Sequence, residues 1–188
     1  MKNKPAPKSE PPPPAGSSDP SQPADHAATG PKAAPEPLKL ARILVPVDFS
    51  DCSLRALDYA LAMAERFGSQ LILLHVVEPA VYPENYLVAS PALDETNQNL
   101  MEAARERLSA LRTKHLGSRL PAETLVRMGR AHSEIPDTAR ALGADLIILG
   151  THGYTGLKHV LLGSTAERVV RHAPCPVLTV RHGTEPAA

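Results

Sequence analysis

From Leu38 onward the chain alternates between two kinds of segment, which differ in how apolar and polar residues are arranged. Short runs that are apolar almost throughout are typical of strands buried on both faces of a sheet. Longer segments in which apolar residues recur every three or four positions are typical of amphipathic helices. The pattern predicts strands at residues 40–47, 70–77, 123–128, 145–149 and 176–180, and helices at residues 51–67, 93–115, 133–142 and 164–172.

Local signals mark several ends of these elements. Ser50 precedes the first helix and is a good N-cap residue, because its hydroxyl can accept a hydrogen bond from a first-turn N–H. Gly68 and Gly143 follow two of the helices, where glycine commonly ends a helix. Pro136 is unusual within the predicted helix at residues 133–142, and it is tolerated if that helix starts near Ile135, because a first-turn proline lacks only an already unpartnered N–H.

Strands and helices that alternate in this way predict an α/β fold with one open parallel sheet, right-handed crossovers and helices on both faces. In such sheets ligands bind beyond the carboxyl ends of the strands, near the point where the strand order reverses. The candidate site therefore lies in the loops that follow three of the strands, at residues 47–50, 76–79 and 150–164.

The two ends of the chain differ from the alternating part. Residues 1–38 are rich in Pro, Ala, Ser and Lys, and after Met1 they hold no large apolar residue before Leu38. Such a segment buries too little surface to offset its ordering entropy, so we expect a disordered, partly polyproline-II tail. A Pro-rich recognition role stays an alternative. The expected domain spans residues 39–183, and residues 184–188 form a short C-terminal tail.

Composition narrows the class of partner. The chain has 20 acidic and 20 basic side chains, with four Tyr, two Phe and no Trp, which argues against nucleic acid or an anionic membrane as a main partner. Cys52 and Cys175 are too few and too far apart for a disulfide framework. No apolar run approaches 18 residues, and prolines follow the N-terminal lysines where a signal peptide would be apolar. We therefore expect a cytoplasmic location.

The segment GTHGYTGLKHVLLGST at residues 150–165 is the strongest candidate for chemistry. It links a predicted strand to a predicted helix, and its glycines have the spacing Gly-x2-Gly-x9-Gly-Ser. Glycines let backbone N–H groups approach an anion, and a helix N-terminus favours negative charge, so the arrangement suits phosphate. The segment is neither a Walker loop nor the dinucleotide fingerprint, because it lacks Gly-Lys-Ser/Thr and Gly-x-Gly-x-x-Gly.

That glycine spacing resembles the nucleotide-binding motif of the universal stress protein family, in its ATP-binding branch. ILVPVDFSDCS, LILLHVVEP and GADLIILGTHGYTGLKHVLLGSTAERVVRHAPCPVLTVR resemble further parts of the family pattern, over about residues 39–182. The resemblance implies an adenine nucleotide alpha-hydrolase-like fold with a five-stranded parallel sheet of order 3-2-1-4-5. It also implies a homodimer in which the last strands, Val177, Leu178, Thr179 and Val180, pair antiparallel.

The resemblance further implies ATP as ligand. It places Pro46, Asp48 and Val76 beside the adenine, and it places around the ribose and phosphates Gly150, Gly153, Gly163, Ser164 and Thr165. His152 lies inside the same loop, where a ribose or phosphate contact stays open. Two alternatives also stay open: Asp48 might serve only to cap the first helix, and Ser164 only to cap the last one.

The implied function is that of a regulatory, ATP-binding stress-response protein with slow hydrolysis at most. No general base is evident, so the catalytic residues are unknown, and no protein metal site is expected; Mg²⁺ or Mn²⁺ would be carried by the phosphates. One alternative is a dimeric interaction scaffold, with an unknown protein partner, in which ATP, AMP or cyclic AMP is only structural. The other is a genuine ATPase or phosphotransferase.

Overall fold

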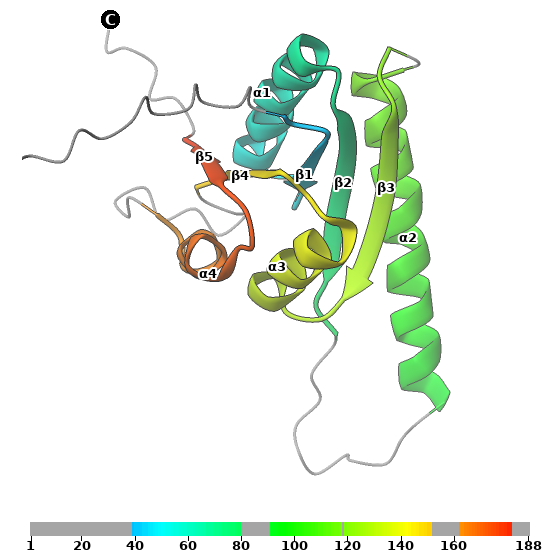
Figure 1. The fold of residues 1–188 in the computed structure, drawn as a ribbon. Coiled ribbons are helices and arrows are strands. Elements are labelled where there is room, and N and C mark those ends of the chain that lie inside the picture. Colours follow the sequence, from blue (N-terminus) through cyan, green and yellow to red (C-terminus); the bar gives the residue numbers. More distant parts are fainter. Residues whose placement is uncertain (1–38, 80–90, 118, 152–161, 182–188) are drawn as a thin grey trace, which may run out of the picture. The chain divides into compact units, whose positions relative to one another are not determined.

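The computed structural model describes residues 39–79, 91–117, 119–151 and 162–181. In these ranges five strands and four helices alternate along the chain (Figure 1). They are β1 (Arg42–Pro46), α1 (Asp51–Phe67), β2 (Gln70–Val77), α2 (Pro91–His115), β3 (Ala122–Met128), α3 (Ala131–Leu142), β4 (Leu146–Gly150), α4 (Ser164–His172) and β5 (Val177–Val180). The expectations for the two tails, for His152 and for Gly153 fall outside the described residues.

The strands form one parallel sheet of order β3-β2-β1-β4-β5, which confirms the predicted fold. The central strand β1 pairs with β2 on one side and with β4 on the other, with Leu44 opposite Ile72 and Ile147. Successive crossovers therefore run outward from β1 in opposite directions, and the order reverses between β1 and β4. The carboxyl ends of these two strands are where an open α/β sheet can hold a ligand.

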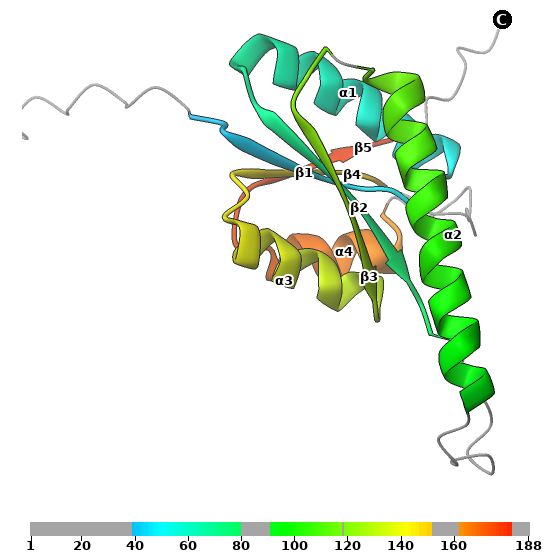
Figure 2. The same cartoon turned by 90° about the vertical axis from the view of Figure 1, so that its right-hand side faces the viewer.

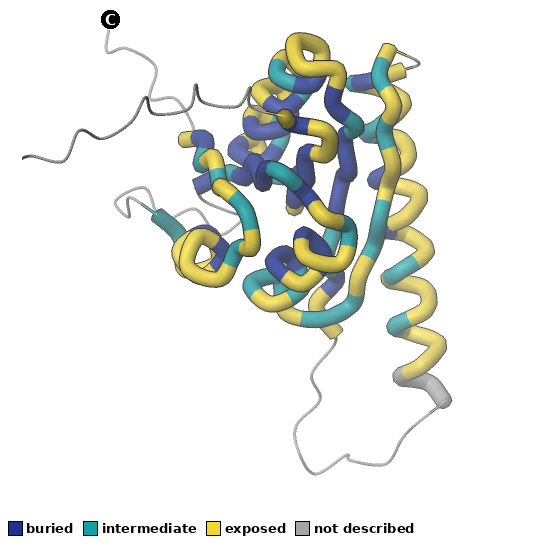
Figure 3. The backbone as a smooth tube through the Cα atoms, viewed as in Figure 1, coloured by how far each residue is buried: buried dark blue, intermediate teal, exposed yellow. Residues whose placement is uncertain are grey.

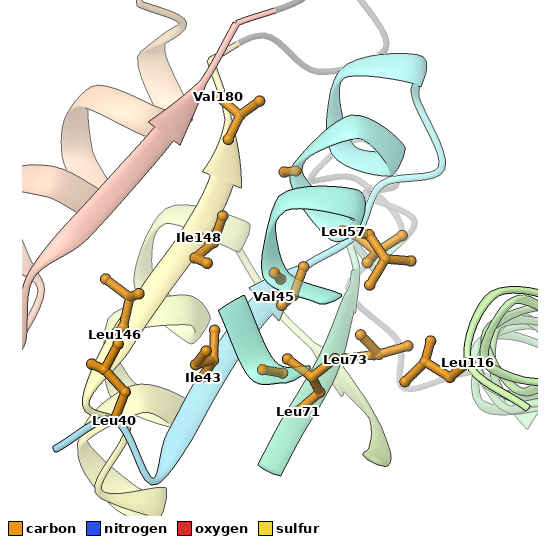
Figure 4. Close-up of a cluster of buried hydrophobic side chains, with 14 of the residues drawn as sticks. Leu40, Ile43, Val45, Leu57, Leu71, Leu73, Leu116, Leu146, Ile148 and Val180 are labelled. Carbon is orange, nitrogen blue, oxygen red and sulfur yellow. The ribbon is translucent and has the colours of Figure 1, made fainter. Parts of the chain in front are cut away.

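Helices cover both faces of the sheet, with α1 and α2 on one face and α3 and α4 on the other (Figure 2). Successive side chains of a strand point to opposite faces, so Ile43 packs in the α1–α2 layer and Leu44 in the α3–α4 layer. Figure 4 shows the first of these layers, in which aliphatic side chains from four strands meet Leu57 of α1 and Leu116, which directly follows α2. Burial on both faces explains why β1, β2 and β4 are largely apolar, whereas the edge strand β3 is partly exposed and carries Glu123 and Arg127 (Figure 3).

The ends of α1 follow the predicted signals. The Ser50 hydroxyl accepts a hydrogen bond from the N–H of Ser53 at 3.2 Å, which caps the helix. Gly68 follows the last turn with φ of 69°, a left-handed conformation that glycine adopts without a steric penalty. The Ser50 cap fixes where the turn after β1 gives way to α1, and that junction forms one wall of the candidate site.

The start of α3 corrects the expectation from sequence. The helix begins at Ala131, before the predicted Ser133 and well before Ile135, because the N–H groups of Ser133 and Glu134 donate to the Arg130 carbonyl at 2.9 and 3.0 Å. Pro136 therefore lies inside the helix, beyond the first turn, and has no N–H to donate to the preceding turn. Its side chain is buried, and this packing offsets the missing hydrogen bond.

Candidate functional site

A pocket of about 200 Å³ lies at the carboxyl ends of β1 and β4, where the strand order reverses. The ends of β1, β2 and β4 and the first turns of α3 and α4 contribute its walls. Seven of the residues predicted from the sequence line it: Pro46, Asp48, Val76, Gly150, Gly163, Ser164 and Thr165. The fold therefore brings together residues that lie more than 100 positions apart in the chain.

Asp48 lies in a tight turn between β1 and α1. Its Oδ1 accepts hydrogen bonds from the backbone N–H of Ser50 at 3.0 Å and from the Ser50 hydroxyl at 2.5 Å. This is an Asx-turn, in which the side chain replaces a backbone acceptor two residues before the donor. The hydroxyl of Ser50, and not the carboxylate of Asp48, caps α1. Asp48 thus holds the capping residue, and its own side chain is exposed along the pocket wall.

Phe49 continues this turn with φ of 65°, and it is the one non-glycine residue with positive φ among those described. The left-handed region costs a bulky side chain roughly 1–3 kcal/mol, so the surroundings must hold it there. Its ring lies 4.7 Å from the ring of His75, and the guanidinium of Arg107 lies 3.9 Å from its centre. A hydrogen bond of 2.7 Å also joins Nδ1 of His75 to the Val47 carbonyl.

The N-terminus of α4 forms the opposite wall. Gly163 is the N-cap and Ser164 the first helical residue, so the alternative that Ser164 caps this helix is wrong. No side chain caps α4 in the described part of the chain. The first N–H groups of a helix have no acceptor within it, so those of Ser164, Thr165 and Ala166 are available at the pocket. Together with the helix dipole they favour an anion at this wall.

Two glycines of the motif have roles other than the one expected of glycines in a phosphate-binding loop. The Gly163 N–H donates to the Thr151 carbonyl at 2.7 Å, so it holds the loop closed, and its φ is −68°, which any residue can adopt. At Gly150 an added Cβ would lie 2.8 Å from the Sγ of Cys52. The missing side chain of Gly150 therefore makes room for α1, while its backbone lines the pocket.

The pocket is electrostatically polar. Asp48 is the one ionisable side chain among its described lining residues, and it follows β1, whereas the α4 N-terminus contributes a different part of the lining. No group of three His, Cys, Asp or Glu side chains that could hold a metal ion occurs in the described ranges. The described part of the chain likewise contains no helix with the length and apolar character needed to cross a membrane.

Sequence reasoning missed part of the lining. Ala131 and Ile135 form a wall at the start of α3, and Ser53 and Thr151 contribute small polar side chains. The start of α3 follows the carboxyl end of β3, so the rule that selected the other three loops could have selected this one too. Ser53 gives no such signal, because it lies inside a helix.

Comparisons with known proteins agree with this geometry. The profile described as the universal stress protein family matches residues 39–181. Universal stress protein MJ0531 of Methanocaldococcus jannaschii is 37% identical over 142 residues, which are 74% of this chain and 81% of that protein. Universal stress protein YxiE of Bacillus subtilis is 33% identical over 145 residues, covering 74% of this chain and 98% of YxiE. The solved structure of universal stress protein UspA from Lactobacillus plantarum superposes with a TM-score of 0.65 at 32% identity, covering 77% of this chain and 100% of that one.

Proposed function

The chain belongs to the universal stress protein family, and from that premise we propose that it binds an adenine nucleotide, ATP in the first place, in the pocket between β1 and β4. Its role would be that of a nucleotide-dependent regulatory protein of the stress response. The observation that carries this proposal is the convergence of the Asp48 carboxylate and the N-terminus of α4 on one pocket at the switch point of the sheet.

The polarity of the pocket orients the ligand. Phosphates are repelled by the Asp48 carboxylate and stabilised by the N-terminal N–H groups of α4, so they lie at Ser164 and Thr165. The base then lies toward Asp48, whose carboxylate can accept a hydrogen bond from the amino group of adenine. Val76 and Pro46 supply an apolar wall for the ring. His152 and Gly153 remain part of the proposed site, although they lie outside the described residues.

Two solved proteins that share this fold contain a bound adenine nucleotide. A universal stress protein in complex with cAMP matches at 24% identity with a TM-score of 0.51, over 77% of this chain and 98% of that one. A family member from Arabidopsis thaliana with AMP bound matches at 20% identity with a TM-score of 0.53, over 77% of this chain and 93% of that one. Binding of cyclic AMP or AMP is therefore the first alternative to ATP.

Hydrolysis is expected to be slow. A general base would have to lie near the water that attacks the terminal phosphate, and the described lining residues offer no ionisable group at the α4 wall. Mg²⁺ or Mn²⁺, if used, would be carried by the phosphates, with the Ser164 hydroxyl as a nearby oxygen. The divalent ion would neutralise phosphate charge on binding.

A homodimer through β5 is part of the proposal. Among the described strands β5 pairs with β4 alone, so no described strand occupies its other edge. The carbonyls of Pro176 and Val180 accept hydrogen bonds from the β4 side, at 3.0 and 2.9 Å. Because backbone groups alternate along a strand, those of Val177 and Thr179 face the open edge, where a second β5 can pair with them.

Nucleotide analysis tests the binding proposal. Mass spectrometry of the small molecules released from freshly purified, denatured protein should find an adenine nucleotide, and calorimetry should rank ATP, AMP and cyclic AMP. Asp48→Asn should weaken binding, whereas Asp58→Asn, an equal charge change on the exposed face of α1, should leave it unchanged. Absence of any adenine nucleotide binding would reject the proposal and favour the scaffold. Rapid turnover with Mg²⁺ would instead favour an ATPase.

A further inference from the structure

The turn that carries Asp48 is held from behind by a cluster of three side chains: Phe49, His75 and Arg107. The Phe49 ring lies between the His75 ring, at 4.7 Å and tilted by 49°, and the Arg107 guanidinium, 3.9 Å from the ring centre. His75 belongs to β2 and Arg107 to α2, so the cluster ties the β1–α1 turn to two other elements.

The cluster lies outside the pocket. Val76 lines the pocket, and its neighbour His75 points to the opposite face of the sheet, as successive strand residues do. Phe49 likewise packs in the α1–α2 layer, and the described pocket lining includes neither Phe49, His75 nor Arg107. These side chains therefore act on a ligand only through the backbone that they hold.

The backbone on both sides of Asp48 is fixed by this cluster. Before it, the Val47 carbonyl is bonded to Nδ1 of His75 at 2.7 Å. After it, Phe49 is held at φ of 65°, a conformation that a phenylalanine adopts only where its surroundings enforce it. The left-handed residue brings the Ser50 N–H back to the Asp48 carboxylate at 3.0 Å and so completes the Asx-turn.

We propose that Phe49, His75 and Arg107 are positioning residues that aim the Asp48 carboxylate at the base and thereby set the selectivity for adenine. This selectivity for adenine rests on the proposed function, the binding of an adenine nucleotide in the pocket. A carboxylate accepts from the 6-amino group of adenine but meets another acceptor at the 6-oxo group of hypoxanthine. A carboxylate of Asp48 that is oriented toward the base therefore favours binding of ATP over inosine triphosphate. If the turn that orients Asp48 becomes more mobile, this preference decreases.

The test compares two arginines of α2. Arg107→Ala removes the cation over the Phe49 ring, while Arg105→Ala removes an exposed arginine paired with Glu102 and serves as the matched control. Calorimetry with ATP and inosine triphosphate gives the ratio of dissociation constants. We expect the wild-type protein to bind ATP about tenfold or more tightly than inosine triphosphate. In the inosine nucleotide, repulsion between the carboxylate and the 6-oxo group replaces the hydrogen bond to the 6-amino group. Arg107→Ala should lower the preference at least about threefold, Arg107→Lys should restore most of it, and Arg105→Ala should leave it unchanged.

Phe49→Asn extends the series, because asparagine tolerates the left-handed conformation but has no ring to stack. Its preference for ATP should fall close to one. A folded Arg107→Ala variant that keeps the wild-type preference would overturn the proposal, and so would a wild type that binds both nucleotides equally well. Should Phe49→Asn fail to fold, Arg107→Ala on the exposed face of α2 still decides the question.

Amide hydrogen exchange at Ser50 separates this inference from the proposed function. The Ser50 N–H donates to Asp48, so its protection reports the aim of that carboxylate whether or not a nucleotide binds. We expect exchange about tenfold faster in Arg107→Ala and unchanged in Arg105→Ala. If the wild-type protein binds no nucleotide, the proposed function and the proposed adenine selectivity are both rejected. The exchange rate of the Ser50 amide still tests whether the cluster positions Asp48. Unchanged Ser50 exchange in Arg107→Ala would overturn the positioning, even with an altered preference.

Discussion

The Cα–H of Gly150 points at the first turn of α1, where a Cβ would lie 2.8 Å from the Sγ of Cys52 and 2.9 Å from its carbonyl carbon. Cys52 is buried in turn, with its thiol donating to the Val180 carbonyl at 3.3 Å. The end of β4 and the start of α1 therefore approach each other as closely as a glycine allows. This contact fixes the distance between two walls of the proposed nucleotide pocket.

Gly150→Ala should therefore destabilise the fold. Forcing one methyl group into this contact should cost about 1–3 kcal/mol, because the backbone of Cys52 has to move. For a domain of this size that corresponds to a fall in melting temperature of roughly 2–10 °C, measurable by calorimetry.

The same substitution in a Cys52→Ala background separates the two parts of the contact. The alanine removes Sγ but leaves the backbone carbon at 2.9 Å, so most of the loss should persist. Full recovery of stability in the double variant would show that the sulfur alone requires glycine. An unchanged melting temperature of Gly150→Ala in the wild-type background would contradict the close approach itself.

Ser164→Asp separates phosphate binding from helix stability. A carboxylate in the first turn of α4 interacts favourably with the helix N-terminus, by about 0.3–1 kcal/mol, so the melting temperature should not fall. The same charge lies where the proposed phosphates bind, so affinity for ATP should drop at least about tenfold while affinity for adenosine stays near wild type. Calorimetry with both ligands measures the difference.

Two further variants calibrate that result. Ser164→Ala removes one hydrogen bond and should cost ATP binding only about 0.5–1.5 kcal/mol. Ser109→Asp adds the same charge on the exposed face of α2 and should change neither affinity. Equal losses for ATP and adenosine in Ser164→Asp would place the phosphates away from α4.

The sequence predicted the elements and three of the loops at the pocket because both follow from local patterns, whereas the individual site residues came from the family resemblance. Apolar runs and amphipathic periods depend on neighbouring residues, and strand ends that precede helix starts identify where Asp48 and Ser164 meet. The strand order came from the family resemblance, since periodicity does not determine which strands are neighbours.

The remaining differences arise from tertiary contacts. Nothing local marks Phe49 as left-handed, because the rings and charge that hold it come from β2 and α2. The Gly163 amide faces Thr151 rather than a ligand because the ends of the loop meet. Pro136 lies inside α3 because burial of its ring outweighs the rule against interior proline.

Cys175 should react slowly with alkylating reagents at neutral pH. Burial, and then the charge of Asp145, raise the pKa of its thiol above the ordinary value, so the reactive thiolate is scarce. Because the folded state favours the neutral thiol, its contribution to stability is present below the pKa of the unfolded chain and is lost as pH rises through the folded pKa. Labelling with iodoacetamide, followed by peptide mapping, should show a rate that rises at higher pH than for a free thiol.

Cys52 and the unfolded chain are the references for this experiment. Cys52 is buried and should remain unlabelled while the protein is folded. Cys175→Ser should remove the pH-dependent labelling. Labelling of Cys175 at neutral pH as fast as in the denatured chain would contradict the raised pKa.

Thr179→Pro tests the dimer at the open edge of β5. The carbonyls of Pro176 and Val180 face β4, so alternation directs the backbone N–H of Thr179 outward, to the position where a partner strand would accept its donor. Proline removes that N–H while keeping the ladder between β4 and β5, and an edge strand tolerates it. Light scattering should therefore find a folded monomer.

Leu178→Pro is the informative contrast. Leu178 lies opposite Ile148 and directs its N–H toward β4, so proline there breaks the internal ladder and should lower the melting temperature whether or not a dimer exists. If the dimer depends on β5, Thr179→Pro should lose association without losing stability. Leu178→Pro should lose stability. A Thr179→Pro protein that remains dimeric would move the interface away from β5, because no antiparallel ladder can form where the outward donor is missing.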